Sequence, residues 1–148
     1  MKYKIPVSVL VIIFTRYYDV LLLERADRPG FWQSVTGSKD SDQEDLLDTA
    51  KREVEEETGL LVTNENLFDW HRAFEFEIFQ HWRGRYKPGV VNNTEHVFSL
   101  MVDHRADIKI SRDEHLAFRW CNRLEAANKV FSWTNATALR ELPDYHFT

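Results

Sequence analysis

Apolar residues along the chain gather in short runs that predict strands, and one segment between them has a helical period. Residues 7–14 are rich in Val and Ile, which is typical of a central strand buried on both faces. Residues 20–25 follow a polar turn and predict a hairpin partner for that strand. Further extended segments are predicted at residues 31–36, 68–82, 94–103, 108–110 and 117–121.

The helical period is clearest over residues 42–58, which predict the best-defined helix of the chain. Its apolar residues recur at helical spacing, at Leu46, Leu47, Ala50 and Val54. Ser41 followed by Glu44 predicts a capping box at the start, and Gly59 stands where a C-cap glycine belongs. Two more helices are predicted over residues 123–129 and 135–142, the second of them packing on the sheet.

The order of these elements indicates an α+β protein with a mixed sheet flanked by helices. Strands come in runs around one strong helix, and this disfavours a regular alternation of strand and helix. The 148 residues contain no internal repeat and no low-complexity linker. We therefore expect a single domain over residues 1–148.

Charge and composition exclude several classes of protein. The formal net charge of −5 disfavours broad binding to a nucleic-acid polymer, although a metal ion can invert the local charge at a phosphate site. Cys121 is the only cysteine, which rules out a disulfide within the chain, and no activating pattern surrounds it. The apolar run near the start is too short to span a bilayer and has no cleavage site after it. We expect a cytoplasmic protein with no membrane contact, and its oligomeric state stays open.

Glutamates cluster at the end of the predicted helix. Glu53, Glu56 and Glu57 are spaced i, i+3 and i+4, so they share a face on which like charges repel. The helix macrodipole also disfavours anions in the last turn. A hard cation with oxygen ligands, Mg²⁺ or alternatively Mn²⁺, would relieve both effects. A solvated acidic face is the commoner explanation of a glutamate triplet, but Arg52 beside the cluster and Gly59 after it favour a metal site.

The segment resembles the Nudix box, whose pattern is Gly-x5-Glu-x7-Arg-Glu-apolar-x-Glu-Glu-x-Gly-apolar. The matching residues are Gly37, Glu44, Arg52, Glu53, Val54, Glu56, Glu57, Gly59 and Leu60. One departure is clear, because six residues rather than five separate Gly37 from Glu44, which predicts an extra residue in the loop before the helix. The resemblance to the Nudix hydrolase family implies an α/β/α sandwich with the box as loop–helix–loop.

The resemblance also implies roles for the matching residues. Glu53, Glu56 and Glu57 would bind metal, and Glu53 or a neighbouring glutamate would act as general base on water. Arg52 would orient the cluster through a salt bridge, while Glu44 would be structural. The implied catalytic residues are therefore Glu53, Arg52 and Glu56.

Shorter matches resemble one group within this family, the bacterial dihydroneopterin triphosphate pyrophosphohydrolases, also described as dATP pyrophosphohydrolases. They lie at residues 4–8, 31–38, 74–79, 85–89, 93–95, 114–117 and 132–133. By this resemblance Glu114 is a further metal ligand. Substrate contacts are expected from Lys4, Arg25, Thr36, Phe76, Glu77, Ile78, Phe79 and Ser132. Each has a plain alternative as a strand-end, surface, capping or core residue.

The implied activity is Mg²⁺-dependent hydrolysis of a nucleoside or pterin triphosphate to the monophosphate and pyrophosphate. The substrate would be dihydroneopterin triphosphate, in folate biosynthesis, or dATP. One alternative keeps the chemistry and changes the substrate to an oxidised nucleotide or a dinucleoside polyphosphate. The other is a ligand-sensing Nudix domain without catalysis, which the retained glutamates of the box disfavour.

Overall fold

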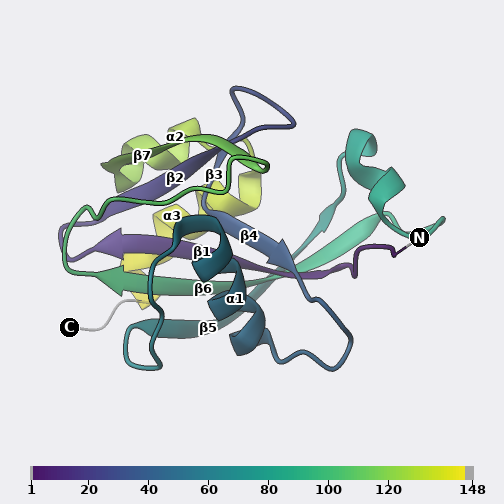
Figure 1. Ribbon diagram of the computed structural model, residues 1–148, viewed down its shortest axis with the longest axis horizontal. Coiled ribbons are helices and arrows are strands. Elements are labelled where there is room, and N and C mark those ends of the chain that lie inside the picture. The colour runs from purple at the N-terminus through teal and green to yellow at the C-terminus, as the bar shows by residue number, and fades with distance from the viewer. Residues whose placement is uncertain (1, 146–148) are drawn as a thin grey trace.

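The computed structural model describes residues 2–145 (Figure 1). Its strands are β1 (Val7–Thr15), β2 (Asp19–Arg25), β3 (Trp32–Gln33), β4 (Val35–Ser38), β5 (Leu67–Glu77), β6 (Asn92–Val102) and β7 (His115–Asn122). Its helices are α1 (Leu46–Thr58), α2 (Arg123–Lys129), α3 (Trp133–Tyr145) and the 3-10 helix η1 (Gln80–Arg85). In this described part of the chain no helix is long and apolar enough to cross a membrane.

The strands form one mixed sheet whose main path runs β3-β2-β1-β6-β5. β1 and β6 pair in parallel from Val7 opposite Thr94 to Thr15 opposite Val102. β5 pairs antiparallel with β6, and β7 pairs antiparallel with β2. β4 lies antiparallel to the first half of β1, so that the chain leaves the sheet beside the start of β1 and enters the loop before α1.

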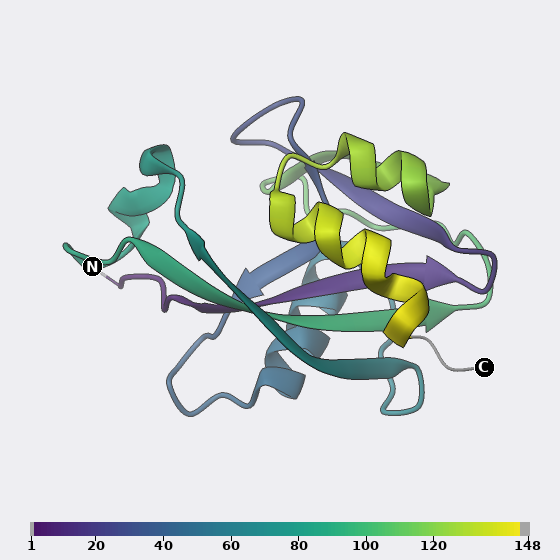
Figure 2. The same ribbon diagram turned by 180° about the vertical axis from the view of Figure 1, so that it is seen from behind.

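β1 separates two hydrophobic cores, because its side chains alternate between the faces of the sheet. Val9, Val11 and Ile13 pack with the apolar side of α1. Leu10, Ile12 and Phe14 pack with residues of α2 and α3. Figures 1 and 2 show α1 on one face of the sheet and α2 and α3 on the other. The predicted strand buried on both faces and the predicted mixed sheet flanked by helices are confirmed.

The start of α1 differs from the prediction. The helix begins at Leu46, and its N-cap is Asp45, whose carboxylate accepts a hydrogen bond from the backbone N–H of Leu47 at 3.1 Å. Glu44 lies before the helix, so the predicted capping box of Ser41 and Glu44 is wrong. The end is as predicted, since Gly59 is the C-cap with φ 73°, a left-handed conformation that favours glycine.

Three predicted extended segments also differ. The segment at residues 31–36 is divided into β3 and β4, because the backbone N–H of Ser34 donates to Asn135 Oδ1 at 2.8 Å instead of to a strand. β5 stops at Glu77 rather than at residue 82, and the chain turns into η1. Residues 108–110 form no strand, and the backbone N–H of Lys109 donates to Thr58 O, at the end of α1.

Candidate active site

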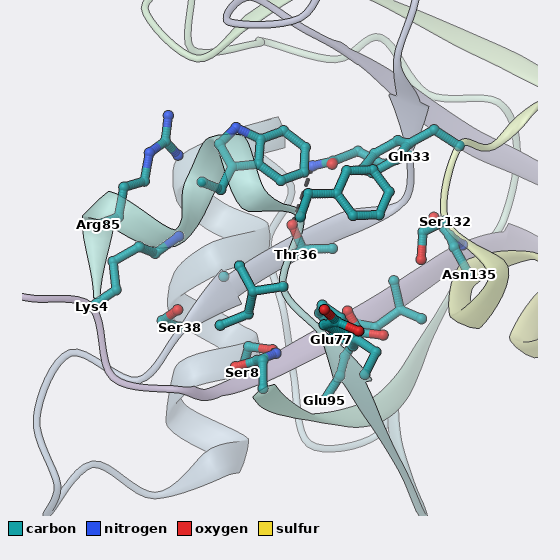
Figure 3. Close-up of a pocket in the computed structure, with 18 of the residues that line it drawn as sticks. Lys4, Ser8, Gln33, Thr36, Ser38, Glu77, Arg85, Glu95, Ser132 and Asn135 are labelled. Carbon is teal, nitrogen blue, oxygen red and sulfur yellow. Dashed lines mark hydrogen bonds between the residues drawn. The ribbon is translucent and has the colours of Figure 1, made fainter. Parts of the chain in front are cut away.

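Two adjoining hollows open beside β4. The aromatic hollow, of about 240 Å³, is lined by side chains of β5, β6, η1 and the start of α3 (Figure 3). The acidic hollow is lined by Glu53 and Glu57 of α1 and by Glu114 and His115 at the start of β7. Both hollows share Lys4, Arg25, Gln33, Thr36, Gly37, Ser38 and Arg85. One elongated molecule can therefore occupy both.

Glu57 is the deepest acid of the acidic hollow. Only 3% of this residue is exposed, its Oε1 lies 3.5 Å from His115 Nε2, and its Oε2 has no hydrogen-bond partner among the described residues. An oxygen of Glu114 comes within 4.8 Å of ligand atoms of both Glu57 and His115. The structure thus brings Glu114 to the helix glutamates from a distant part of the chain. It adds His115, which was not among the residues predicted for the site.

Glu53 lies directly over Gly37. A Cβ atom built on Gly37 would meet Glu53 Cδ at 2.0 Å, which no real contact allows. The glycine of the box is therefore required here by close approach, because φ at this position is not in the left-handed region. β4 in this way fixes where the first glutamate of the cluster can lie.

Arg52 ties the loop, β4 and the cluster together. Its guanidinium donates to both carboxylate oxygens of Glu44 at 3.0 Å, to Ser38 O at 3.0 Å and to Glu53 Oε1 at 2.8 Å. Glu56 Oε2 lies 3.5 Å from the same guanidinium. The Glu56 side chain is 57% exposed and lines neither hollow, so it stands at the rim while Glu53 and Glu57 face inward.

Burial has the largest effect on the pKa values of the side chains that line the acidic hollow. It raises the pKa of Glu53 to about 7, an effect that Arg52 opposes. Burial, together with Glu53 and Glu114, raises the pKa of Glu57 well above its ordinary value. Burial also lowers the pKa of His115 to about 4, which keeps the imidazole neutral. The hydrogen bonds from Arg52 lower the pKa of Glu44 to about 2, so that carboxylate stays ionised beside the guanidinium.

This donor set fits a divalent metal ion. Buried carboxylates crowd one another here, and the Oε2 atom of Glu57 and the Nδ1 atom of His115 have no partner among residues 2–145. A buried charge of one sign is unfavourable unless it is paired or protonated. Oxygen ligands of this kind are those that Mg²⁺ prefers, and a neutral imidazole can also bind a metal.

Replacing Glu53 with Gln is expected to flatten the pH dependence of stability between pH 5 and pH 8 in metal-free buffer. The unfolded chain releases the Glu53 proton near pH 4.5, whereas the fold holds it up to about pH 7. The stability that this group contributes is fully present below pH 4.5 and is lost as the pH rises through 7. The free energy of unfolding of the variant minus that of the parent should therefore rise with pH, by on the order of 3 kcal/mol in total.

Urea unfolding of both proteins in the presence of a chelator measures this difference. His115 acts in the opposite direction, because the unfolded chain protonates it below pH 6.5 while the fold does not. Only the comparison of variant and parent isolates Glu53 from that effect. A difference that stays constant from pH 5 to pH 8 would contradict the assignment.

Cationic side chains lie where the two hollows meet. Arg25 donates through Nε and Nη2 to the two carboxylate oxygens of Asp27, at 2.8 and 2.9 Å, and through Nη1 to Gln33 at 3.0 Å. Its guanidinium also lies over the ring of Trp82, at 4.3 Å from the ring centroid. Arg85 donates to the same Asp27 carboxylate at 2.9 Å. Arg85 was not among the residues predicted to contact the substrate, although it lines both hollows.

The aromatic hollow contains every residue predicted to contact substrate, namely Lys4, Arg25, Thr36, Phe76, Glu77, Ile78, Phe79 and Ser132. Phe79 stacks on Trp82 with ring centroids 5.5 Å apart and meets Phe131 edge to face at 5.8 Å. Phe74, from the same predicted segment, packs in the core with α3 and lines neither hollow. The Glu77 side chain is 74% exposed and pairs with Arg83.

A polar floor of the aromatic hollow was also missed as a site. Its residues are Ser8, Asn93, Glu95 and Asn135. Asn93 Nδ2 donates to Ser8 Oγ at 2.7 Å, and Thr134 Oγ1 donates to Glu95 Oε1 at 2.7 Å. Asn93 and Glu95 lie in residues 93–95, one of the short matches described in the sequence analysis. Their spacing of two residues on a predicted strand was the only sequence feature that placed both side chains on one face of the sheet.

Comparison with known proteins places the chain in a family. The NUDIX domain model matches residues 4–142. The dihydroneopterin triphosphate diphosphatase of Escherichia coli K12 is 45% identical over 142 residues, which are 94% of this chain and 93% of the relative. The enzyme of the same name from Haemophilus influenzae is 41% identical over 95% of this chain and 89% of its own length.

The solved structures agree with this placement. The structure of the Escherichia coli dihydroneopterin triphosphate pyrophosphohydrolase superposes with a TM-score of 0.89 and 44% identity, covering 95% of this chain and 97% of that one. The predicted α/β/α sandwich with a loop–helix–loop box, α1 and its flanking loops, is thus the Nudix fold. On these grounds the chain belongs to the NUDIX domain family of hydrolases.

Proposed function

We propose that this protein hydrolyses dihydroneopterin triphosphate to the monophosphate and pyrophosphate, with Mg²⁺ as its metal ion. The observation that carries the proposal is the junction of an aromatic hollow with an acidic hollow through shared cationic side chains. A planar ring suits the first hollow, and a phosphate chain with metal suits the second. The activity named for the near-full-length relatives supports the pterin ring over adenine.

Glu53, Glu57 and Glu114 would hold the metal, with Glu56 joining from the rim. His115 offers an additional ligand atom beside Glu57. A divalent ion bound there would neutralise phosphate charge and lower the pKa of a bound water. Mn²⁺ has the same preference for oxygen ligands and is expected to substitute.

Glu53 is proposed as the general base that takes the proton from the attacking water. Burial raises the pKa of Glu53 to about 7 in the metal-free fold, and a bound cation would lower that pKa, so that the carboxylate is ionised and able to accept the proton. Arg52 holds Glu53 Oε1 at 2.8 Å and so keeps the other oxygen of the carboxylate free to face the water. Arg52 is thus proposed to position the base, and Glu56 to complete the charge of the cluster.

The remaining predicted residues are proposed to hold the substrate. Lys4 and Arg25 would meet phosphate oxygens through charge-assisted hydrogen bonds, and Arg85 joins them. Thr36 would donate its hydroxyl at the junction of the hollows. Side chains of β5 and of the residues after it would surround the ring together with Ser132; they are Phe76, Glu77, Ile78 and Phe79. The proposed unit is the single domain of residues 1–148 acting on a small molecule, not on a nucleic-acid polymer.

The test is a substrate panel with identification of products. The protein is incubated with Mg²⁺ and dihydroneopterin triphosphate, dATP, an oxidised dNTP or a dinucleoside polyphosphate. We expect pyrophosphate and the monophosphate, with the highest kcat/KM for dihydroneopterin triphosphate and no turnover after chelation. Faster turnover of another substrate would replace the pterin assignment, and no turnover of any would contradict hydrolysis.

A further inference from the structure

We propose that Glu95 selects the ring of the substrate by accepting hydrogen bonds from two adjacent N–H groups of a 2-amino-4-oxo pyrimidine ring, with Asn93 beside it as a further acceptor. This inference rests on the proposed function. It adds which edge of the substrate ring forms hydrogen bonds with the protein.

Glu95 is a buried acid that the fold itself does not use. It lies on β6, opposite Ser8 of β1 and Phe74 of β5, and only 5% of the residue is exposed. Within residues 2–145 this carboxyl accepts one hydrogen bond, from Thr134 Oγ1 to Glu95 Oε1 at 2.7 Å, and no cation pairs with it. An acid buried with so little compensation destabilises the fold. A role in ligand binding would explain why it is present.

Thr134 fixes the orientation of that carboxyl. Ser132 Oγ lies 2.8 Å from Thr134 Oγ1, and the Thr134 proton is given to Glu95, so Ser132 donates to Thr134. The chain of hydroxyls at the start of α3 thus occupies one side of Oε1. Glu95 lines the aromatic hollow, where Figure 3 shows it together with Ser8, Glu77 and Ser132.

Asn93 provides a second, independent observation on the same floor. It stands two residues before Glu95 on β6, so both side chains lie on one face of the sheet. Asn93 is 3% exposed, and its Oδ1 has no hydrogen-bond partner among the described residues, while Nδ2 donates to Ser8. A buried acceptor without a donor is unfavourable. The floor therefore offers acceptors in excess of donors.

This excess of acceptors matches one kind of ring edge. A 2-amino-4-oxo pyrimidine presents a ring N–H and an amino group side by side, and an ionised carboxylate accepts from both. The corresponding edge of adenine alternates a donor with an acceptor, so it leaves one carboxylate oxygen facing a lone pair. Burial raises the pKa of Glu95 to about 7, and two N–H donors would favour the ionised form on binding.

The test compares two substrates in one variant. In Glu95→Gln one acceptor oxygen becomes an NH₂ donor. This donor would face an N–H group of the 2-amino-4-oxo ring, whereas it could donate to the ring nitrogen of adenine. We expect the ratio of kcat/KM for dihydroneopterin triphosphate to that for dATP to fall by about 10²-fold or more. Because the ratio is taken within one protein, partial loss of folded enzyme affects both values equally. Glu75→Gln, an exposed site on β5 that lines neither hollow, should leave the ratio unchanged.

A second measurement does not depend on hydrolysis. Calorimetry of neopterin binding in metal-free buffer should give a Kd at least about tenfold weaker for Glu95→Gln than for the parent. If the parent hydrolyses triphosphates but both the ratio and the Kd stay unchanged in the variant, the assignment of Glu95 is wrong. If the parent hydrolyses nothing, the proposed function fails, and the neopterin Kd values alone decide whether Glu95 reads the ring.

Discussion

Replacing Glu57 with Gln is expected to lower kcat/KM by about 10³-fold or more, which corresponds to roughly 4 kcal/mol in the transition state. Glu57 is the most deeply buried acid of the acidic hollow, and its Oε2 has no partner among the described residues. Gln has the same shape but carries no negative charge to offset that of a metal ion. Pyrophosphate release and calorimetric titration with Mg²⁺ measure the loss of activity and of metal affinity together.

The same substitution should leave the metal-free protein folded. Burial, together with Glu53 and Glu114, raises the pKa of Glu57 well above its ordinary value, so the metal-free fold favours the neutral form of this side chain more than the unfolded chain does. A neutral amide of similar volume is then expected to change the free energy of unfolding by less than about 1 kcal/mol. Glu55→Gln, on the exposed side of α1, is the matched control and should keep full activity. A Glu57→Gln variant with more than a tenth of the parent activity would remove Glu57 from the metal site.

Replacing Gly37 with Ala is expected to lower kcat/KM by about 10²-fold, because a misplacement of about 1 Å in a catalytic group can have that effect. The new Cβ would stand 2.0 Å from Glu53 Cδ, and the Glu53 side chain is the part that can move. Glu53 would leave its position over β4 and its hydrogen bond with Arg52 would be broken. The steady-state rate with the preferred triphosphate substrate measures the effect.

The loss should lie in activity rather than in folding. The atoms that the Cβ meets belong to the far end of a flexible side chain, and φ at Gly37 lies outside the left-handed region. The free energy of unfolding is therefore expected to change by no more than about 1 kcal/mol. Gly84→Ala is the control, since a Cβ there meets nothing within 4 Å. Full activity in Gly37→Ala would show that catalysis does not need Glu53 where it lies.

Sequence patterns predicted those elements whose structure follows from residues close together in the chain. The spacing of Leu46, Ala50 and Val54 was sufficient for α1, and helix geometry alone placed Glu53 and Glu57 on a common side. The composition of β1 indicated burial on both faces, and the two cores confirm it. The predicted start of α1 was wrong because several side-chain oxygens near residues 40–45 can cap a helix. In the fold Asp45 caps α1, and Glu44 binds Arg52 instead.

The parts that sequence did not predict depend on contacts between distant segments. Asn135 reaches Ser34 across 101 positions, and Arg85 reaches Asp27 across 58. Such pairs follow from sheet pairing and from where η1 folds, and no local period encodes them. The polar floor around Glu95 has the same origin, because β5 and α3 close over β6 only in the assembled sheet.

The position of β4 between the two hollows sets a length scale. Thr36, Gly37 and Ser38 line both hollows, and a strand rises only about 3.3 Å per residue. Because each of these residues is paired with β1, the spacing cannot stretch as a loop would. The protein should therefore select substrates by the length of the spacer between the ring and the anionic chain. A spacer about as long as a sugar should be accepted. Molecules with the same two ends held further apart should be rejected on distance alone.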